Sequence, residues 1–259
     1  MYPTIHLVLP SYMVFAVLGA FAAVVFLYLR IDRNRLSFVD FMKMFGVSVI
    51  FGAIGSRVLF FITRVPWLIG HFSVANLLEC TLGGGFVFYG GLFGLLYGVG
   101  RYCRKHAIEE KRIYNMIAPA IPLFHAFGRV GCFMAGCCHG FAFSEPVTIW
   151  NAVTLYSFPT QIVEAVFVFV LFIVLYLLQR KERELNYLRI YLMAYAVFRF
   201  LIEFTRGDAV RGVVAGISTS QIISVMILVV CTVKLRKDYA QKKKDVAEDR
   251  QEADEIIAQ

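Results

Sequence analysis

Long apolar blocks recur along this chain of 259 residues and constrain its fold more than any other feature. A helix needs roughly 20 mostly apolar residues to cross the hydrocarbon core of a bilayer. Backbone polar groups cannot stay unpaired in lipid, so blocks of this length must be helical. We therefore predict an all-α, polytopic membrane protein with seven transmembrane helices, at residues 10–29, 44–62, 82–100, 113–133, 162–178, 190–204 and 212–233.

The composition and the loop charges agree with this class. Hydrophobic residues make up 59% of the chain and charged residues 17%, which excludes disorder, a coiled-coil rod and an ordinary soluble enzyme. Clusters of Lys and Arg follow the first, third, fifth and seventh blocks. Because cationic loops stay in the cytoplasm, we expect the N-terminus outside and the C-terminus inside. The net charge of +8 then reflects topology, and we expect no nucleic-acid partner.

The chain divides by charge into two parts. We expect a seven-span membrane domain at residues 1–237 and a charged, helical cytoplasmic tail at residues 238–259, where acidic and basic residues are mixed.

Ionisable residues inside the apolar blocks cost a few kcal/mol each, and by default they mark function. Arginines outnumber carboxylates among them, and a guanidinium binds phosphate oxygens in bidentate fashion, so we predict a site for a phospholipid head group. Alternatively, each side chain extends to the membrane surface or forms a structural pair. The residues are Arg57, Arg129, Glu164, Arg199 and Glu203, with His125 added if it is buried.

One predicted helix carries three polar residues at four-residue intervals. Tyr195, Arg199 and Glu203 fall on a single stripe, and Arg206 continues that face near the outer end. Arg199 and Glu203 can pair within the helix, which partly offsets the cost of burying them.

Cys132, Cys137, Cys138 and His139 fall within eight residues, among several glycines. This density suggests thiol chemistry or a metal. Zinc sites usually draw their ligands from two separated pairs, and this chain has no second pair, so we predict no metal. A disulfide between Cys132 and either Cys137 or Cys138 is permissible if the segment faces outside. The remaining cysteines are scattered, and we expect them to serve packing only.

Short motifs in a fixed order resemble the bacterial prolipoprotein diacylglyceryl transferase family. Residues 55–58 are similar to its Gly-Ala/Gly-Arg-Leu segment, residues 88–94 to Phe-His-Gly-Gly-Leu-x-Gly, and residues 128–133 to Gly-Arg-x-Gly-Asn-Phe. Residues 159–164 resemble Pro-Ser-Gln-x-x-Glu, and residues 195–206 resemble Tyr-x-x-x-Arg-x-x-x-Glu-Phe-x-Arg. Residues 218–224 fit the Gln-Ile-x-Ser start of the last span.

The resemblance implies an enzyme of the bacterial cytoplasmic membrane. It would move a diacylglyceryl group from phosphatidylglycerol, or a similar anionic phospholipid, to the lipobox cysteine of a preprolipoprotein, without a cofactor. The catalytic positions carried over are Tyr89, Arg129, Arg199, Glu203, Cys132 and Cys137, and the substrate-binding positions are Arg57, Glu164, Tyr195, Arg206, Gly90, Gly91 and His139.

The sequence departs from the family at the positions nearest the chemistry. Tyr89 replaces the family's histidine, Cys132 and Ala135 replace its two asparagines, and Cys137 replaces its acidic residue. Two alternatives therefore stay open. One is the same scaffold with a thiol/redox or cysteine-carrier lipid reaction, and the other is a non-enzymatic phospholipid-binding membrane protein. The sequence leaves the true acceptor, the acyl chains and the oligomeric state undetermined.

Overall fold

The computed structural model describes residues 4–5, 9–32, 35–83, 87–149, 153–181, 185–207, 213–214 and 217–258. Most of these residues lie in helices, and three short antiparallel hairpins accompany them. The chain forms two compact units. The first comprises Met1–Gly136 and Ala165–Leu188, and the second comprises Cys137–Glu164 and Arg189–Gln259.

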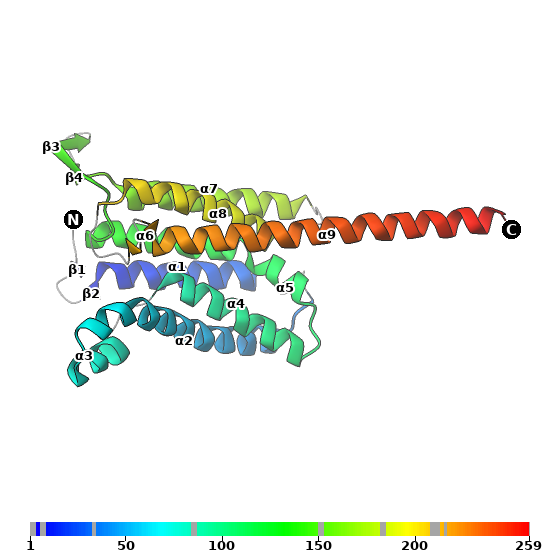
Figure 1. Cartoon of the computed structure of the whole chain (residues 1–259), viewed down its shortest axis with the longest axis horizontal. Helices are drawn as coiled ribbons and strands as arrows, with labels where there is room; N and C mark the ends of the chain where they lie inside the picture. The colour runs from blue at the N-terminus through cyan, green and yellow to red at the C-terminus, as the bar shows by residue number, and fades with distance from the viewer. Residues whose placement is uncertain are drawn as a thin grey trace. The chain divides into compact units, whose positions relative to one another are not determined.

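The first unit is built from helices of very different lengths. Within it, α2 lies beside α4, and α1 lies beside α6 (Figure 1). Its elements are β1 (Thr4–Ile5), β2 (Leu9–Pro10), α1 (Ser11–Tyr28), α2 (Phe38–Gly70), α3 (Val74–Leu78), the π-helical turn η2 (Glu79–Gly83), α4 (Phe88–Lys105), α5 (Glu110–Ile117), α6 (Ala120–Ala135) and most of α7 (Thr160–Arg180).

Glycines allow α2 and α4 to approach closely. A Cβ atom added to Gly94 would collide with the carbonyl oxygen of Phe51, and one added to Gly90 would collide with that of Gly55. A Cβ on Gly98 would lie 2.7 Å from the Cα of Ser48. Small residues at such a contact let two helix backbones pack directly against each other in a membrane. This packing alone requires glycine at position 90, which the sequence analysis assigned to substrate binding.

The second unit contains the longer hairpin and the last helix. Its elements are β3 (Ala142–Ile149), β4 (Val153–Ser157), the first turn of α7, α8 (Tyr187–Ile202) from Arg189 onward, the 3₁₀ turn η3 (Glu203–Thr205), β5 (Val213–Val214), β6 (Ile217–Ser218) and α9 (Thr219–Ala258). In the β3–β4 hairpin Thr148 pairs with Thr154, and the register shifts between Ala142 and Val147. The shift includes Pro146, which has no N–H to donate to a ladder.

A reciprocal cap starts α9. The backbone N–H of Gln221 donates to the Ser218 hydroxyl at 3.2 Å, and the Ser218 N–H donates to the Gln221 side-chain oxygen at 3.0 Å. This is a capping box, and it satisfies two backbone donors at a helix start. The predicted last span began at Gly212, but the helix begins at Thr219, because the β5–β6 hairpin precedes it. Residues 212 and 215–216 of that predicted span lie outside the described residues.

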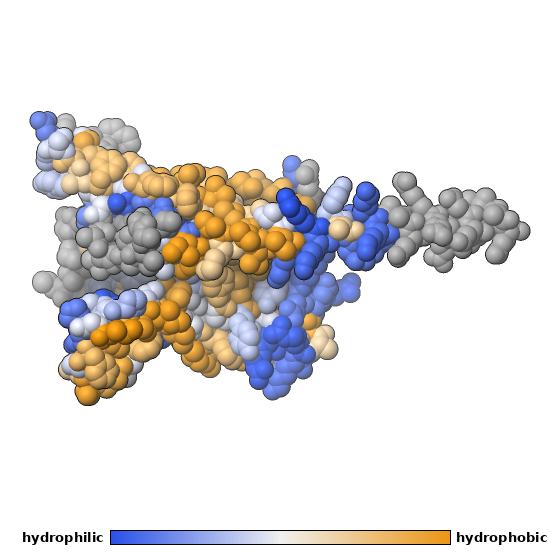
Figure 2. Space-filling model, in the orientation of Figure 1, coloured by the Kyte–Doolittle hydropathy of each residue, from blue (hydrophilic) through white to orange (hydrophobic). Residues whose placement is uncertain are grey.

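Five helical segments are long and apolar enough to cross a bilayer. They are Ser11–Tyr28, Phe38–Gly70, Glu110–Ala135, Thr160–Arg180 and Thr219–Asp245. Large apolar side chains are exposed along them, such as Phe21 and Ile50, and Figure 2 shows apolar residues over much of the visible helical surface. Such exposure suits lipid rather than water, and the predicted membrane class is confirmed. The strands are a departure from the strictly all-α prediction.

The two remaining predicted spans correspond to α4 and α8. Helix α4 has 18 residues and begins at Phe88 rather than at residue 82, and residues 84–86 lie outside the described part of the chain. The printed range of α8 has 16 residues. Neither is among the five segments that are both long and apolar enough to cross a bilayer, so a total of exactly seven spans stays a prediction.

Candidate functional site

Arg199 and Glu203 form a buried ion pair. The guanidinium Nη1 lies 2.6 Å from the carboxylate Oε2, and both side chains are almost fully enclosed. Arg199 lies in the last turn of α8 and Glu203 begins η3, so the four-residue spacing seen in the sequence brings them together. Arg199 Nη2 also donates to the hydroxyl of Ser220 at 3.1 Å. The guanidinium is therefore held from two directions, by α8–η3 and by the first turn of α9.

A second polar pair extends the same stripe of α8. The Tyr195 hydroxyl donates to Glu164 Oε1 at 2.8 Å, and Glu164 is completely enclosed in the first turns of α7. The Tyr195 ring is stacked on that of Tyr191, with centroids 5.9 Å apart. Because a buried carboxylate is costly unless it is hydrogen-bonded, this contact is part of what makes Glu164 tolerable there. Four of the residues selected from the sequence thus form two buried contacts within one unit.

The first unit contains a separate polar contact. Arg129 Nε donates to Nε2 of His125, one turn earlier on α6, at 3.2 Å. An arginine can only donate, so the accepting His125 nitrogen carries no proton and its other ring nitrogen does. The His125 ring is buried and stacked on Phe88, with centroids 4.3 Å apart. The sequence places His125 among the intramembrane residues only if it is buried, and the structure buries it. Its spacing of four residues from Arg129 is the sequence signal for this contact.

The neighbouring predicted residues of this unit lie on α2 and α4. Tyr89 is buried in the first turn of α4, and its ring is stacked on Phe93. Gly91 follows in a less crowded position than Gly90, since a Cβ there would make only ordinary contacts with Ser56. Arg57 lies on α2 and is half-buried, next to Ser56, whose hydroxyl donates to the Val87 carbonyl at 3.0 Å. This bond ties α2 to the residue that precedes α4.

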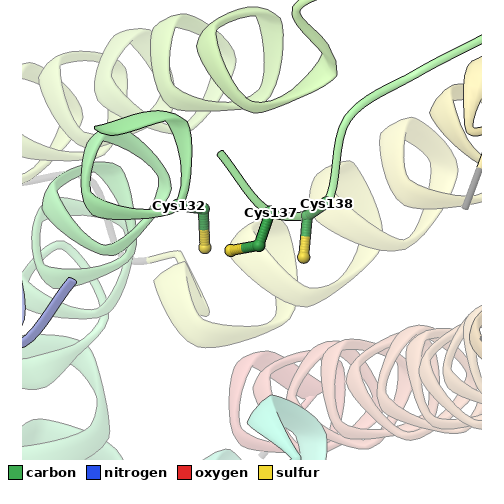
Figure 3. A group of neighbouring side chains, drawn as sticks. All are labelled: Cys132, Cys137 and Cys138. Atoms are coloured by element: carbon green, nitrogen blue, oxygen red, sulfur yellow. The ribbon is translucent and has the colours of Figure 1, made fainter. Parts of the chain in front are cut away.

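Three cysteine sulfurs lie together at the C-terminal end of α6, one from its last turn and two from the turn that follows. The Sγ atoms of Cys132, Cys137 and Cys138 are all within 4.8 Å of one another, and Figure 3 shows Cys137 directed toward Cys132. Cys132 is buried, Cys137 is exposed and Cys138 is intermediate. No disulfide joins any of the six cysteines, so the disulfide considered from the sequence is not formed in this structure. The other three, Cys80, Cys103 and Cys231, are buried apart from this group, as expected for packing residues.

The backbone around these cysteines turns sharply. Gly136 caps α6 in the left-handed conformation at φ 74°, and its N–H bonds back to the last turn of the helix. Cys138 also adopts a positive φ of 60°, which is unusual for a residue with a side chain. The buried Gln161 amide donates to the Cys137 carbonyl at 2.6 Å. The turn is thus set by a helix cap, a left-handed cysteine and a side-chain hydrogen bond.

The segment that follows joins this turn to η3. Gly140 forms an isolated antiparallel bridge with Arg206, and the Phe141 N–H donates to the Thr205 carbonyl at 2.9 Å. A Cβ on Gly140 would lie 2.6 Å from the Thr160 hydroxyl oxygen, so only glycine fits. Arg206 is half-buried, and His139 is exposed, with Nδ1 3.0 Å from the Gly140 carbonyl oxygen. The bridge places His139 and Arg206, both predicted to bind substrate, in neighbouring backbone segments.

The site residues therefore form local groups inside each unit. The second unit combines Tyr195–Glu164, Arg199–Glu203 and the His139–Arg206 corner, and the first combines Arg129–His125 with Tyr89 on the adjoining α4. Arginines held by such partners, Arg199 buried and Arg129 half-buried, can neutralise and orient an anion. The cysteine turn can supply thiols or thiolates.

Comparison with known proteins gives one consistent family. The sequence model of the prolipoprotein diacylglyceryl transferase family matches residues 3–236. A Clostridium tetani protein named phosphatidylglycerol–prolipoprotein diacylglyceryl transferase is 31% identical over 220 residues, covering 82% of this chain and 86% of its own length. A second enzyme of that name, from Clostridium perfringens, is 33% identical over 191 residues, covering 71% of this chain and 73% of its own.

A more distant relative matches over a longer stretch. A Streptococcus equi protein of the same name is 26% identical over 241 residues, which is 89% of this chain and 91% of the relative. The match runs through every element that carries the polar contacts above, from α2 to the start of α9. These matches identify the chain as a member of the prolipoprotein diacylglyceryl transferase family.

Proposed function

We propose that this chain transfers a diacylglyceryl group from phosphatidylglycerol, or a similar anionic phospholipid, to the cysteine thiol of a lipobox in a preprolipoprotein. The names of its relatives contain phosphatidylglycerol and prolipoprotein, which supports this choice of donor and acceptor. The observation that carries the proposal is the buried Arg199–Glu203 pair, held by Ser220 and flanked by the Tyr195–Glu164 bond. A membrane protein retains such a group in its interior for a function, because burial of the charges is costly.

The proposed setting is the bacterial cytoplasmic membrane, with seven spans, the N-terminus outside and the C-terminus inside. Helices α4 and α8 would supply two spans in addition to the five segments that are long and apolar enough to cross a bilayer. At 1.5 Å per residue, their 18 and 16 residues extend about 27 and 24 Å, close to a hydrocarbon core of about 30 Å. The membrane domain would end near residue 237, and the charged remainder of α9 would enter the cytoplasm.

Arg129 and Arg199 would hold the lipid phosphate, with Arg57 and Arg206 in support. Arg199 is oriented by Glu203 and Ser220, and Arg129 by His125, so neither guanidinium needs to reorganise when the lipid arrives. A guanidinium has five N–H donors in a planar fork, which matches phosphate oxygens in bidentate fashion. Glu164 and Tyr195 would keep this face of α8 in register with α7.

The acceptor sulfur would attack as a thiolate, because the thiol itself is a poor nucleophile. It bonds to the glyceryl carbon next to the phosphate, the carbon–oxygen bond breaks, and its electron pair leaves with glycerol phosphate. The arginines stabilise the negative charge of this leaving group. Tyr89, Glu203 and His139 can accept the thiol proton. We assign the proton to His139, because its imidazole is exposed and a ring nitrogen can accept a proton.

The direct test uses purified protein in liposomes that contain phosphatidylglycerol labelled in its glycerol head group. Addition of a lipobox peptide should release labelled glycerol phosphate and lipidate the peptide, and a peptide with serine in place of cysteine should do neither. An Arg129→Ala variant should lose the reaction. Phospholipid binding without release would instead support the non-enzymatic alternative, and a diacylglyceryl adduct on the protein itself would support a cysteine carrier.

A further inference from the structure

The steps proposed above assign no role to one group of side chains, the cysteines Cys132, Cys137 and Cys138. Their three Sγ atoms lie within 4.8 Å of one another, and the metal-binding group of the described residues contains these three side chains only. We propose that they bind a thiophilic divalent cation of the zinc class, and that the fourth coordination position receives the acceptor thiol. The second part of this inference rests on the proposed function.

The sulfur geometry fits a metal with little adjustment. A zinc–sulfur bond is about 2.3 Å long, so two sulfurs on one tetrahedral ion lie about 3.8 Å apart. The observed spread of at most 4.8 Å can close to that value by small side-chain rotations. Figure 3 shows the Cys137 sulfur directed toward that of Cys132.

The backbone of the turn positions the cysteine side chains before a metal binds. Gly136 at φ 74° reverses the chain after α6, and Cys138 at φ 60° occupies a conformation that costs a side-chain-bearing residue about 1 kcal/mol or more. The buried Gln161 amide fixes the Cys137 carbonyl at 2.6 Å. Strain of this kind persists only where the surroundings over-determine the conformation, and it gathers at functional sites.

Three protein ligands distinguish this site from a structural zinc site. Structural zinc is closed by four protein ligands, whereas catalytic zinc has three and leaves one position open. The sequence contains no second pair of cysteines, and this argues only against a structural zinc site closed by four protein ligands. His139 follows directly, but its Nδ1 lies 3.0 Å from the Gly140 carbonyl oxygen and it is not part of the group.

The open position explains how the enzyme could work without the family's own polar residues. Cys132 and Cys137 stand where the resemblance places an asparagine and an acidic residue. A thiol that coordinates the ion loses its proton outright, which produces the nucleophile at neutral pH. The bound thiolate attacks the glyceryl carbon, the carbon–oxygen bond breaks with its electrons leaving on glycerol phosphate, and the released proton passes to water.

The first test measures metal binding without any turnover. Fully reduced protein in detergent is titrated with Co²⁺ while the sulfur-to-cobalt charge-transfer absorption is recorded. We expect about one ion per chain, displaced by Zn²⁺. Cys137→Ala should lose this absorption, and Cys231→Ala, which changes a buried cysteine elsewhere in α9, should retain it. Cys137 is exposed, so its loss should leave folding intact, which thermal unfolding would verify.

Equal cobalt uptake by the reduced wild type and the Cys137→Ala variant would overturn the metal site. So would a disulfide between any two of the three cysteines that reforms in the presence of Zn²⁺.

The second test separates this inference from the transferase itself. Addition of a lipobox peptide to the cobalt protein should change the charge-transfer band, and the serine peptide should not. An unchanged band would overturn the role of the open position while leaving the metal site intact. Arg129→Ala should bind cobalt normally even though it transfers nothing. Loss of transfer in the wild type with normal cobalt binding would therefore count against the proposed function and not against the site.

Discussion

The guanidinium of Arg199 lies 2.6 Å from the carboxylate of Glu203, and both groups are enclosed at the junction of α8 and η3. This ion pair fixes the orientation of Arg199 before any lipid binds, and Ser220 adds a second restraint at 3.1 Å. Its value to stability and its value to catalysis can be measured separately.

Removal of one partner should destabilise the protein. Glu203→Gln or Arg199→Ala leaves an uncompensated buried charge or polar group, which costs about 3–5 kcal/mol. Both variants should unfold at lower temperature in detergent, and both should lose transfer activity.

The double variant Arg199→Met with Glu203→Leu separates the two effects. Apolar replacement of both partners of a buried pair is often neutral or stabilising, so the unfolding temperature should return near that of the wild type. Transfer should nevertheless stay absent, because the phosphate ligand is missing. Recovery of activity in this variant would refute a direct role for Arg199.

The bond between Tyr195 and Glu164 should behave as a coupled pair. Tyr195→Phe removes the donor and leaves the Glu164 carboxylate with one partner fewer, at a cost of about 1–3 kcal/mol. Glu164→Gln should cost less in the Tyr195→Phe background than in the wild type. A double-mutant cycle on the free energy of unfolding measures this coupling, and strictly additive effects would show that the two side chains act independently.

The contact from Arg129 to His125 should control phospholipid affinity. His125→Phe preserves the aromatic stack on Phe88 but removes the nitrogen that accepts from Arg129. We expect KM for phosphatidylglycerol to rise about tenfold, the equivalent of about 1.4 kcal/mol, with a smaller change in kcat. His125→Gln retains an acceptor and should recover most of the affinity. An unchanged KM in His125→Phe would assign the histidine to packing alone.

Helix packing gives a prediction that is independent of the chemistry. Gly94→Ala would drive a methyl group into the carbonyl oxygen of Phe51, so α2 and α4 must separate. Overpacking of this kind costs about 1–3 kcal/mol or more. Gly46→Ala is the matched control on α2, since a Cβ there meets nothing within 4 Å. The unfolding temperature should fall for the first variant only.

Local spacing accounts for what the sequence could predict of the site. The four-residue interval from Arg199 to Glu203 places both on one helical stripe, and the same interval links His125 to Arg129. Contacts between distant segments carry no such signal. The bond from Tyr195 to Glu164 spans 31 residues, and it follows from how α7 and α8 pack rather than from either sequence alone. The proximity of three sulfurs likewise depends on the left-handed residues Gly136 and Cys138.

The long apolar helices were predicted from the sequence, whereas the hairpin and the exact helix starts were not. Apolar length identified the five membrane-length segments, because hydrocarbon tolerates only helices. The β3–β4 hairpin was missed, although Val147, Thr148 and Thr154 are residues that favour strands. The late start of α9 was also missed, and its signal was available as the Ser218–Gln221 capping box.

Helix α9 is one uninterrupted rod of 40 residues, about 60 Å long, and a bilayer core accounts for only about half of that length. Up to residue 245, the side chains beyond its apolar stretch are mostly hydrophilic (Figure 2). Its first turn contains Ser220, the hydroxyl that restrains Arg199. A continuous ladder of backbone hydrogen bonds resists twisting. Rotation of the charged end about the helix axis would therefore also move the Ser220 hydroxyl that restrains Arg199.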